Sequence, residues 1–211
     1  MNVALFSAVL LLGIGASQTR PMTASPVAIS LYYESMCGGC RDMIRDQLYP
    51  TFQKVGSIMD ITLVPYGNAQ EYRYGNKWVF NCQHGQGECE GNIIEVCAIN
   101  VLKNISAYFP FIHCFEQFIS SYNPSSTAQY CAKQLGIDYA PIEKCASGLQ
   151  GNELEHEMGV ETDALVPRHN YVPWVTLNGE HTEEIQNQAT FNMLGLVCDN
   201  YQGARPAACG N

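Results

Sequence analysis

The hydrophobic pattern of the chain predicts two strands joined by a helix near the N-terminal end. Val27 to Glu34 (VAISLYYE) is rich in β-forming residues, and Met59 to Pro65 (MDITLVP) is a second apolar, β-branched run. Between them, apolar residues recur at helical spacing: Met43, Ile44, Leu48 and Phe52. Pro50 should kink or end this helix. The order predicts a βαβ unit with a parallel strand pair and a right-handed crossover.

The middle of the chain is predicted to be a loop followed by helices. Tyr66 to Gln83 contains several Gly and Asn turn formers and is expected to be loop. Residues of about 85 to 160 then show helical spacing of apolar residues in four segments: Glu88 to Lys103, Tyr108 to Ser121, Ser126 to Leu135 and Ile142 to Leu149. A mostly helical insertion therefore follows the βαβ unit.

The pattern returns to strand near the C-terminal end. Tyr171 to Leu177 is β-rich, and Asn178-Gly179 is a strong hairpin signal. Glu180 to Glu184 is expected to form a short return strand, and Ile185 to Cys198 a last helix. The predicted order is β-α-β, helical insertion, β-β-α, which is an α/β fold.

The N-terminus is typical of a signal peptide over residues 1–18, because an apolar run is followed by small residues. The alternative is an apolar first strand or helix. A lead-in at 19–26 would precede one domain at 27–209. The formal net charge of −9 argues against nucleic acid or an anionic membrane as a partner.

Ten cysteines follow the apolar run, and an even number in an exported chain predicts structural disulfides. Eight of them are candidates for such bridges: Cys82, Cys89, Cys97, Cys114, Cys131, Cys145, Cys198 and Cys209. Their pairing stays open, although Cys198 and Cys209 are close enough in sequence to form one pair. Asn104-Ile105-Ser106 is a candidate N-glycosylation site.

The remaining cysteines form Cys37-Gly-Gly-Cys40 at the predicted junction of strand and helix. A helix N-terminus favours a thiolate, so Cys37 is the candidate nucleophile and Cys40 the candidate resolving thiol. The alternatives are a structural bridge, or half of a zinc site completed by Cys82, His84 or Cys89.

Val172-Pro173 precedes the last predicted strand. In the cis form it would present the Val172 backbone beside the cysteines, where an extended peptide could pair with it. The alternative is an ordinary edge-strand proline.

One block of the sequence is similar to a known family. Cys82 to Cys97 matches CQHGxxECxxNxxxxC, the signature of the gamma-interferon-inducible lysosomal thiol reductases. Leu63 to Gln70, Tyr171 to Val175 and the tail at Leu196 to Cys198 and Tyr201 to Gly203 also resemble that family, so the resemblance runs from about Val27 to Cys209.

The resemblance implies a thioredoxin-like fold with a helical insertion and reduction of protein disulfides in endosomes and lysosomes, in support of antigen processing. It implies Cys37 as nucleophile, Cys40 as resolver and Pro173 as the cis-proline. We expect His84 to fix a loop and not to carry protons. The expected partners are disulfide-containing proteins and a small-thiol electron donor, with no bound cofactor or metal, and the chain is expected to be a monomer or dimer.

Two other functions stay open from the sequence. A secretory-pathway oxidase or isomerase could use the same fold, because the direction of exchange depends on the reduction potential. A secreted, zinc-stabilised binding module without enzymatic activity is the other.

Overall fold

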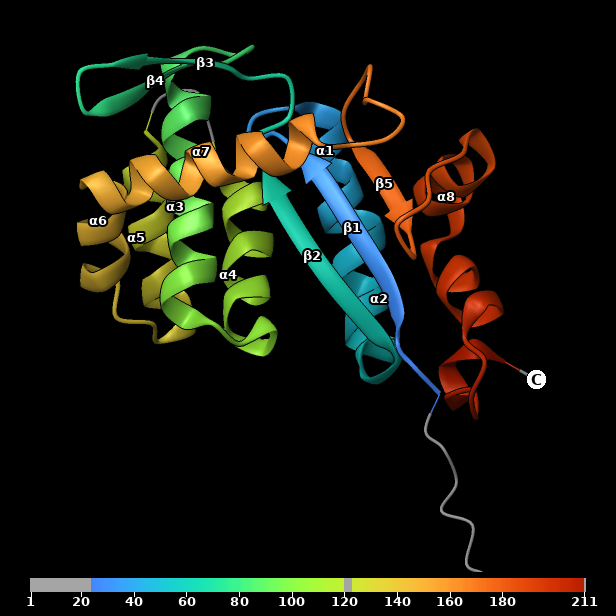
Figure 1. The fold of residues 1–211 in the computed structure, drawn as a ribbon. Helices are drawn as coiled ribbons and strands as arrows, with labels where there is room; N and C mark the ends of the chain where they lie inside the picture. The colour runs from blue at the N-terminus through green and yellow to red at the C-terminus, as the bar shows by residue number, and fades with distance from the viewer. Residues whose placement is uncertain (1–23, 120–122, 211) are drawn as a thin grey trace, which may run out of the picture.

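The computed structural model describes residues 24–119 and 123–210, and a three-stranded sheet lies at its centre (Figure 1). β1 (Val27–Tyr33) is the middle strand, in the order β2-β1-β5. It runs parallel to β2 (Met59–Pro65) and antiparallel to β5 (Trp174–Leu177). The predicted βαβ unit is therefore present, and both of its strands end at the same edge of the sheet.

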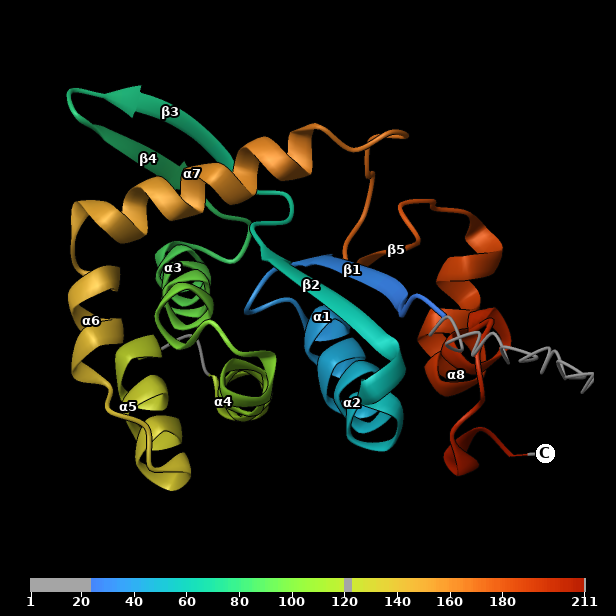
Figure 2. The same cartoon turned by 60° about the horizontal axis from the view of Figure 1, so that its bottom comes forward.

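A continuous helical segment connects β1 to β2. It consists of α1 (Gly38–Asp42), a π-helical stretch η1 (Met43–Leu48) and α2 (Tyr49–Val55), and a 3-10 turn η2 (Gly56–Ile58) follows. Pro50 lies in the first turn of α2 and does not end the helix, because the wider π-helical stretch just before it accommodates a residue without an N–H. Figure 2 shows this segment and α8 (Glu183–Asn200) on the same face of the sheet.

Alternation along β1 explains how both faces of the sheet are covered. Ile29, Leu31 and Tyr33 are fully buried and belong to the main core with α1, α2 and α8. Tyr32 points to the other face, where it packs in a second cluster with Met158 of α7. The sheet is thus enclosed on both sides at the edge where the site lies.

The described residues of the insertion form five helices, and their apolar faces extend the main core. They are α3 (Gln86–Leu102), α4 (Ile105–Phe118), α5 (Pro124–Leu135), α6 (Ala140–Ala146) and α7 (Leu149–Asp163). Phe109, Phe111 and Phe115 of α4 are fully buried. Disulfides Cys97–Cys145 and Cys114–Cys131 join α3 to α6 and α4 to α5.

The loop predicted over residues 66–83 is in part a hairpin of β3 (Gln70–Tyr74) and β4 (Lys77–Asn81). The loop prediction was wrong because the strands lack a clear apolar face and are held instead by α7. Asn152 accepts a hydrogen bond from the Trp78 N–H and donates one to the Trp78 carbonyl, each at 2.8 Å. His156 stacks on the Trp78 ring at 3.7 Å.

The return strand predicted at residues 180–184 does not form. The Asn178-Gly179 turn is present, but pairing stops after a single bridge between Leu177 and Glu180. The Thr182 side chain then accepts a hydrogen bond from the Ile185 N–H and starts α8 at Glu183. The helix cap competes successfully with the strand, because it satisfies a free N–H in the first turn of the helix.

The predicted signal peptide lies outside the described residues, as does most of the lead-in segment. Within residues 24–119 and 123–210, none of the helices has the length and apolar character needed to cross a bilayer. A last 3-10 turn, η3 (Ala207–Cys209), is tied to α8 by the Cys198–Cys209 disulfide.

Candidate active site

Cys37 and Cys40 lie where β1 ends and the helical segment begins. Cys37 is the N-cap residue of α1, with extended backbone angles, and its sulfur accepts a hydrogen bond of 3.3 Å from the Cys40 N–H. Cys37 is half-buried, whereas Cys40, one turn further along, is completely buried. Both cysteines are free thiols. Because of the difference in burial, the Cys37 sulfur is accessible to a partner and the Cys40 sulfur is not.

The surroundings of Cys37 favour its thiolate. The Cys40 thiol donates to its sulfur, and the backbone N–H groups of Cys40 and Gly39 and the nearby His84 add to this effect. Together they outweigh burial and lower the pKa of Cys37 to about 6. Burial and the neighbouring Cys37 raise the pKa of Cys40 well above its usual value, so the two thiols are clearly differentiated.

The Val172-Pro173 peptide bond is cis and lies beside the cysteines. Register explains this placement, because Trp174 pairs with Tyr32, so the residues before β5 lie next to the end of β1. A Cβ atom at Gly39 would lie 3.4 Å from the Pro173 side chain, which shows how closely α1 approaches this loop. The structure therefore brings Val172 and Pro173 together with the cysteine pair.

A groove of about 480 Å³ opens beside Gly39 and Pro173, between the helical segment and α8. Its lining includes Met43 and Tyr171 as apolar surface and Gln186 as a polar group. An extended peptide placed here would run past Pro173, one residue before the first residue of β5.

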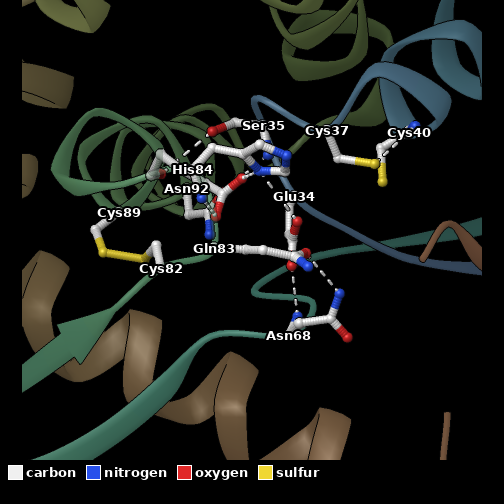
Figure 3. A network of polar contacts seen from close by, with 11 residues as sticks. Glu34, Ser35, Cys37, Cys40, Asn68, Cys82, Gln83, His84, Cys89 and Asn92 are labelled. Atoms are coloured by element: carbon white, nitrogen blue, oxygen red, sulfur yellow. Dashed lines mark hydrogen bonds and ion pairs between the residues drawn. A yellow bond between two sulfur atoms is a disulfide. The ribbon is translucent and has the colours of Figure 1, made fainter. Parts of the chain in front are cut away.

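On another side of Cys37, His84 lies next to Glu34 (Figure 3), and its Nδ1 faces two buried carboxyl groups, those of Glu34 and Glu88. Its Nδ1 is hydrogen-bonded to Glu88 and lies 3.5 Å from Oε2 of Glu34. Both glutamates are completely buried, whereas the His84 side chain is 43% exposed. Burial, with the charges of Glu88 and Cys37, raises the pKa of Glu34 to about 7, although the Asn68 N–H and His84 oppose the rise.

The signature residues hold the segment that leads into Cys37. Asn92 accepts a hydrogen bond from the Ser35 N–H at 3.0 Å, and the Ser35 hydroxyl donates to the Glu88 carbonyl at 3.2 Å. A Cβ atom at Gly91 would lie 2.3 Å from the Ser35 hydroxyl, so this position requires glycine. The Cys82–Cys89 disulfide ties the preceding loop to α3.

The segment after β2 completes this support. The Asn68 N–H donates to Glu34 at 2.7 Å, and the Asn68 side chain donates to Gln83 at 3.0 Å. Gly67 has a φ of +60°, and a Cβ atom there would lie 2.3 Å from Glu34. Three segments far apart in sequence thus meet around Glu34, three residues before the reactive cysteine.

Behind Cys40 lies a second group of buried acids. Glu95 of α3 and Glu116 of α4 are completely buried, and the Arg41 guanidinium donates to the Glu116 carbonyl at 2.8 Å. Burial raises the pKa of Glu95 to about 8 and the pKa of Glu116 well above its usual value. These carboxyls are therefore neutral in the acidic range.

The eight other cysteines are all paired: Cys82–Cys89, Cys97–Cys145, Cys114–Cys131 and Cys198–Cys209. Asn104 is exposed and caps α4, accepting a hydrogen bond from the Ser106 N–H at 2.9 Å. None of these residues contacts the groove.

In the described part of the chain, one group of side chains has the spacing of a metal site: the ligand atoms of Glu34, His84 and Glu88 lie within 4.8 Å of one another. The Nδ1 of His84 is hydrogen-bonded to Glu88, so these side chains are paired with each other. The zinc arrangements considered from the sequence require cysteine ligands at Cys82 or Cys89. Those two sulfurs bond to each other, so neither is available as a thiolate.

Comparisons with known proteins agree on fold and chemistry. The family described as gamma interferon inducible lysosomal thiol reductase (GILT) matches residues 28–135. A gamma-interferon-inducible lysosomal thiol reductase from Carassius auratus is 46% identical, covering 92% of this chain and 76% of the relative. The Mus musculus protein of the same name is 39% identical over 91% of this chain and 75% of the relative.

Solved structures show the same fold at low identity. DsbA from Chlamydia trachomatis aligns with a TM-score of 0.55 at 16% identity, covering 79% of this chain and 86% of that one. A thioredoxin-like oxidoreductase from Silicibacter pomeroyi DSS-3 aligns with a TM-score of 0.51 at 12% identity, over 79% and 85% of the two chains.

A thioredoxin-like fold with an accessible thiol and a buried thiol at the start of a helix defines the class of thiol-disulfide oxidoreductases, and this protein is one. Within that class, the chain belongs to the gamma-interferon-inducible lysosomal thiol reductase family.

Sequence reasoning did not identify Glu34, Ser35 or Asn92 as part of the site. Glu34 is hidden at the end of a strand, and only the structure shows that it faces His84. Asn92 and Glu88 belong to the signature block, which was the available signal for their importance. The block alone does not show which loop these residues support.

Proposed function

We propose that this enzyme reduces disulfide bonds of protein substrates in an acidic endosomal or lysosomal compartment, with Cys37 as nucleophile and Cys40 as resolving thiol. The observation that carries the proposal is the contrast between the two sulfurs. Cys37 is half-buried with a lowered pKa, and Cys40 is completely buried with a raised one. Unfolding antigens for proteolysis is the use that the family resemblance suggests for this activity.

The reaction consists of two exchanges. The Cys37 thiolate attacks a substrate disulfide, forming a mixed disulfide and releasing the first substrate sulfur. The Cys40 thiol loses its proton and attacks Cys37, forming the Cys37–Cys40 bridge and releasing the second substrate sulfur. An external small thiol then returns two electrons to the pair, so no bound cofactor is needed.

The lowered pKa of Cys37 matters most in acid. At pH 5, a thiol with a pKa of about 6 is roughly 9% thiolate, against roughly 0.03% for an ordinary thiol of pKa about 8.5. Intrinsic nucleophilicity falls by roughly 15-fold over the same pKa difference, which reduces this roughly 300-fold gain to a net advantage on the order of 20-fold.

The groove beside Pro173 supports an extended protein substrate. An incoming chain could hydrogen-bond to the Val172 backbone while apolar side chains contact Met43 and Tyr171. The exposed Gly38 leaves space above Cys37, because a Cβ atom there would meet nothing within 4 Å.

Two single substitutions test the mechanism. Cys40→Ser should accumulate a mixed disulfide between Cys37 and a denatured disulfide substrate, which non-reducing electrophoresis and mass spectrometry would detect. Cys37→Ser should reduce insulin at no measurable rate at pH 5. Full activity of the Cys37→Ser protein would eliminate the proposed function.

A disulfide oxidase is the second candidate, because stabilising the Cys37 thiolate also stabilises the reduced enzyme. A pKa of about 6 favours the reduced form by about 11-fold at pH 7 but only about 1.1-fold at pH 5. Equilibration with glutathione should therefore show the pair to be about tenfold more reducing at pH 5 than at pH 7. A change of about 100-fold between the two pH values would mean that the Cys37 thiolate persists at pH 5, and it would favour the oxidase.

A further inference from the structure

The imidazole of His84 has acidic neighbours that a residue serving only to hold a loop would not need. Glu88 already binds the loop through the His84 backbone N–H, at 3.2 Å from Oε1. The same carboxylate also binds the imidazole Nδ1, and Glu34 faces that nitrogen from the end of β1. Within the described part of the chain, Oε2 of Glu34 has no hydrogen-bond partner.

This arrangement determines which ring nitrogen can exchange a proton. The Glu88 carboxylate, which is hydrogen-bonded to Nδ1, keeps a proton on that nitrogen and leaves Nε2 as the exchangeable position. In Figure 3 the His84 ring lies next to Glu34, with the Cys37 side chain beyond it. The charges of His84 and Cys37 also affect each other's pKa.

Exposure decides which member of the cluster can reach a substrate. Glu34 and Glu88 are completely buried, whereas the His84 side chain is 43% exposed. The titratable groups facing His84 are Glu34 at the end of β1, Glu88 on α3 and Cys37 at the start of α1. Burial lowers the pKa of His84, but the hydrogen bond and charge of Glu88 and the charges of Glu34 and Cys37 outweigh it, so the pKa is raised.

The proposed reaction creates a need for an acid at this position. A leaving alkyl thiolate has a pKa of about 8.5, so its release at pH 5 is favoured when a proton is delivered as the S–S bond breaks. Such proton transfer contributes on the order of 10²- to 10⁴-fold in rate.

We propose that His84 is a further catalytic residue, the acid that protonates the departing substrate sulfur, with Glu88 and Glu34 holding its ring in position. The Cys37–substrate S–S bond forms, and the substrate S–S bond breaks with its electron pair on the leaving sulfur. The proton on Nε2 moves to that sulfur, leaving neutral imidazole, which is reprotonated from solvent. This inference rests on the proposed function and adds a residue to it.

The test compares His84→Gln with the wild type on two substrates at pH 5, with chelator present. One is an alkyl disulfide peptide, whose leaving thiolate needs a proton. The other is an aryl disulfide, whose acidic thiolate leaves without one. His84→Gln should slow alkyl disulfide reduction on the order of 100-fold and aryl reduction by only about threefold. Iodoacetamide alkylation of Cys37 supplies the thiolate fraction used to correct both rates.

His156→Gln is the matched control, since His156 also pairs with a glutamate, Glu71, at 2.6 Å, and lies on α7 outside this cluster. It should keep both rates. Equal corrected losses on the two substrates in His84→Gln would overturn the inference while leaving the proposed function intact. A wild type that reduces neither substrate would defeat the proposed function itself.

Glu88→Gln provides a second test that retains the histidine. Without the Glu88 charge, the pKa of His84 should fall, so alkyl disulfide reduction should decline at a lower pH than in the wild type. The aryl profile should follow only the ionisation of Cys37. If the rate of alkyl disulfide reduction declined at the same pH in Glu88→Gln as in the wild type, the inference would be overturned.

Discussion

Gly67 and Gly75 share a positive φ but differ in their surroundings. Both have φ near +60°, a conformation that costs a residue with a side chain about 1–2 kcal/mol. A Cβ atom at Gly75 would meet nothing within 4 Å, whereas one at Gly67 would lie 2.3 Å from Glu34. Only Gly67 is therefore required for packing as well as for backbone conformation.

Gly67→Ala should lower the free energy of unfolding by about 3 kcal/mol and reduce disulfide reductase activity, because Glu34 must move. Gly75→Ala is the control and should cost about 1 kcal/mol with activity unchanged. Denaturant unfolding and insulin reduction measure the two effects. Equal behaviour of the two variants would mean that the close contact with Glu34 is unimportant.

The disulfides differ in what they hold together. Cys82–Cys89 closes a short loop, with a sequence separation of 7, and holds the His84 loop against α3. Cys97–Cys145 closes a separation of 48 and joins α3 to α6, away from the cysteine pair. Loop-closure entropy predicts stabilisation of about 2 kcal/mol for the first and about 4 kcal/mol for the second.

Stability and activity should therefore separate between two double variants. Cys97→Ala/Cys145→Ala should lower Tm more than Cys82→Ala/Cys89→Ala does, at about 2–4 °C for each kcal/mol of lost stability. Cys82→Ala/Cys89→Ala should lower reductase activity more, on the order of tenfold, because the His84 loop loses its position. Calorimetry and insulin reduction at 25 °C would measure both. Larger losses of both quantities in the same variant would contradict this separation.

The sequence predicted well those elements in which the pattern of apolar residues matches the pattern of buried positions. β1 and β2 alternate buried and more exposed residues in their first halves and are fully buried over their last three residues, so their apolar, β-forming runs predicted them accurately. The β3–β4 hairpin was missed because it is held by Asn152 and His156 of α7, which are far away in sequence. The return strand failed because Thr182 caps α8 at that point.

For the site, the sequence was sufficient for the CxxC pair and insufficient for its support. The spacing of Cys37 and Cys40 and the apolar run before them predicted a strand-to-helix junction, which the structure has. The contact between Glu34 and His84 joins residues 50 positions apart through a tertiary arrangement that no local pattern encodes. The expectation that His84 only fixes a loop was drawn without knowledge of that contact.

At the scale of the whole molecule, buried carboxyls make stability depend on pH. Burial raises the pKa of Glu95 from 4.5 to about 8, and raises those of Glu116 and Glu155 well above 4.5. Each group is neutral when folded in acid and resists ionisation as the pH rises. Their stabilising contribution is complete below pH 4.5 and is lost as the pH rises toward about 8.

The protein should therefore melt at a higher temperature at pH 5 than at pH 8. Cys37 acts in the opposite sense, because its pKa is lowered on folding, so the measurement uses the Cys37→Ser/Cys40→Ser variant. Adding Glu95→Gln should reduce the difference in Tm between the two pH values. A Tm that is equal at both values, or higher at pH 8, would show that these carboxyls ionise without cost.

The ionisation of Cys37 in the reduced enzyme is the most direct test of the account. The rate of iodoacetamide alkylation, followed by mass spectrometry from pH 4 to pH 9, should rise with a midpoint at about 6 and place the label on Cys37 while Cys40 stays unmodified. A midpoint close to the ordinary thiol value of about 8.5, or labelling of Cys40 first, would contradict it.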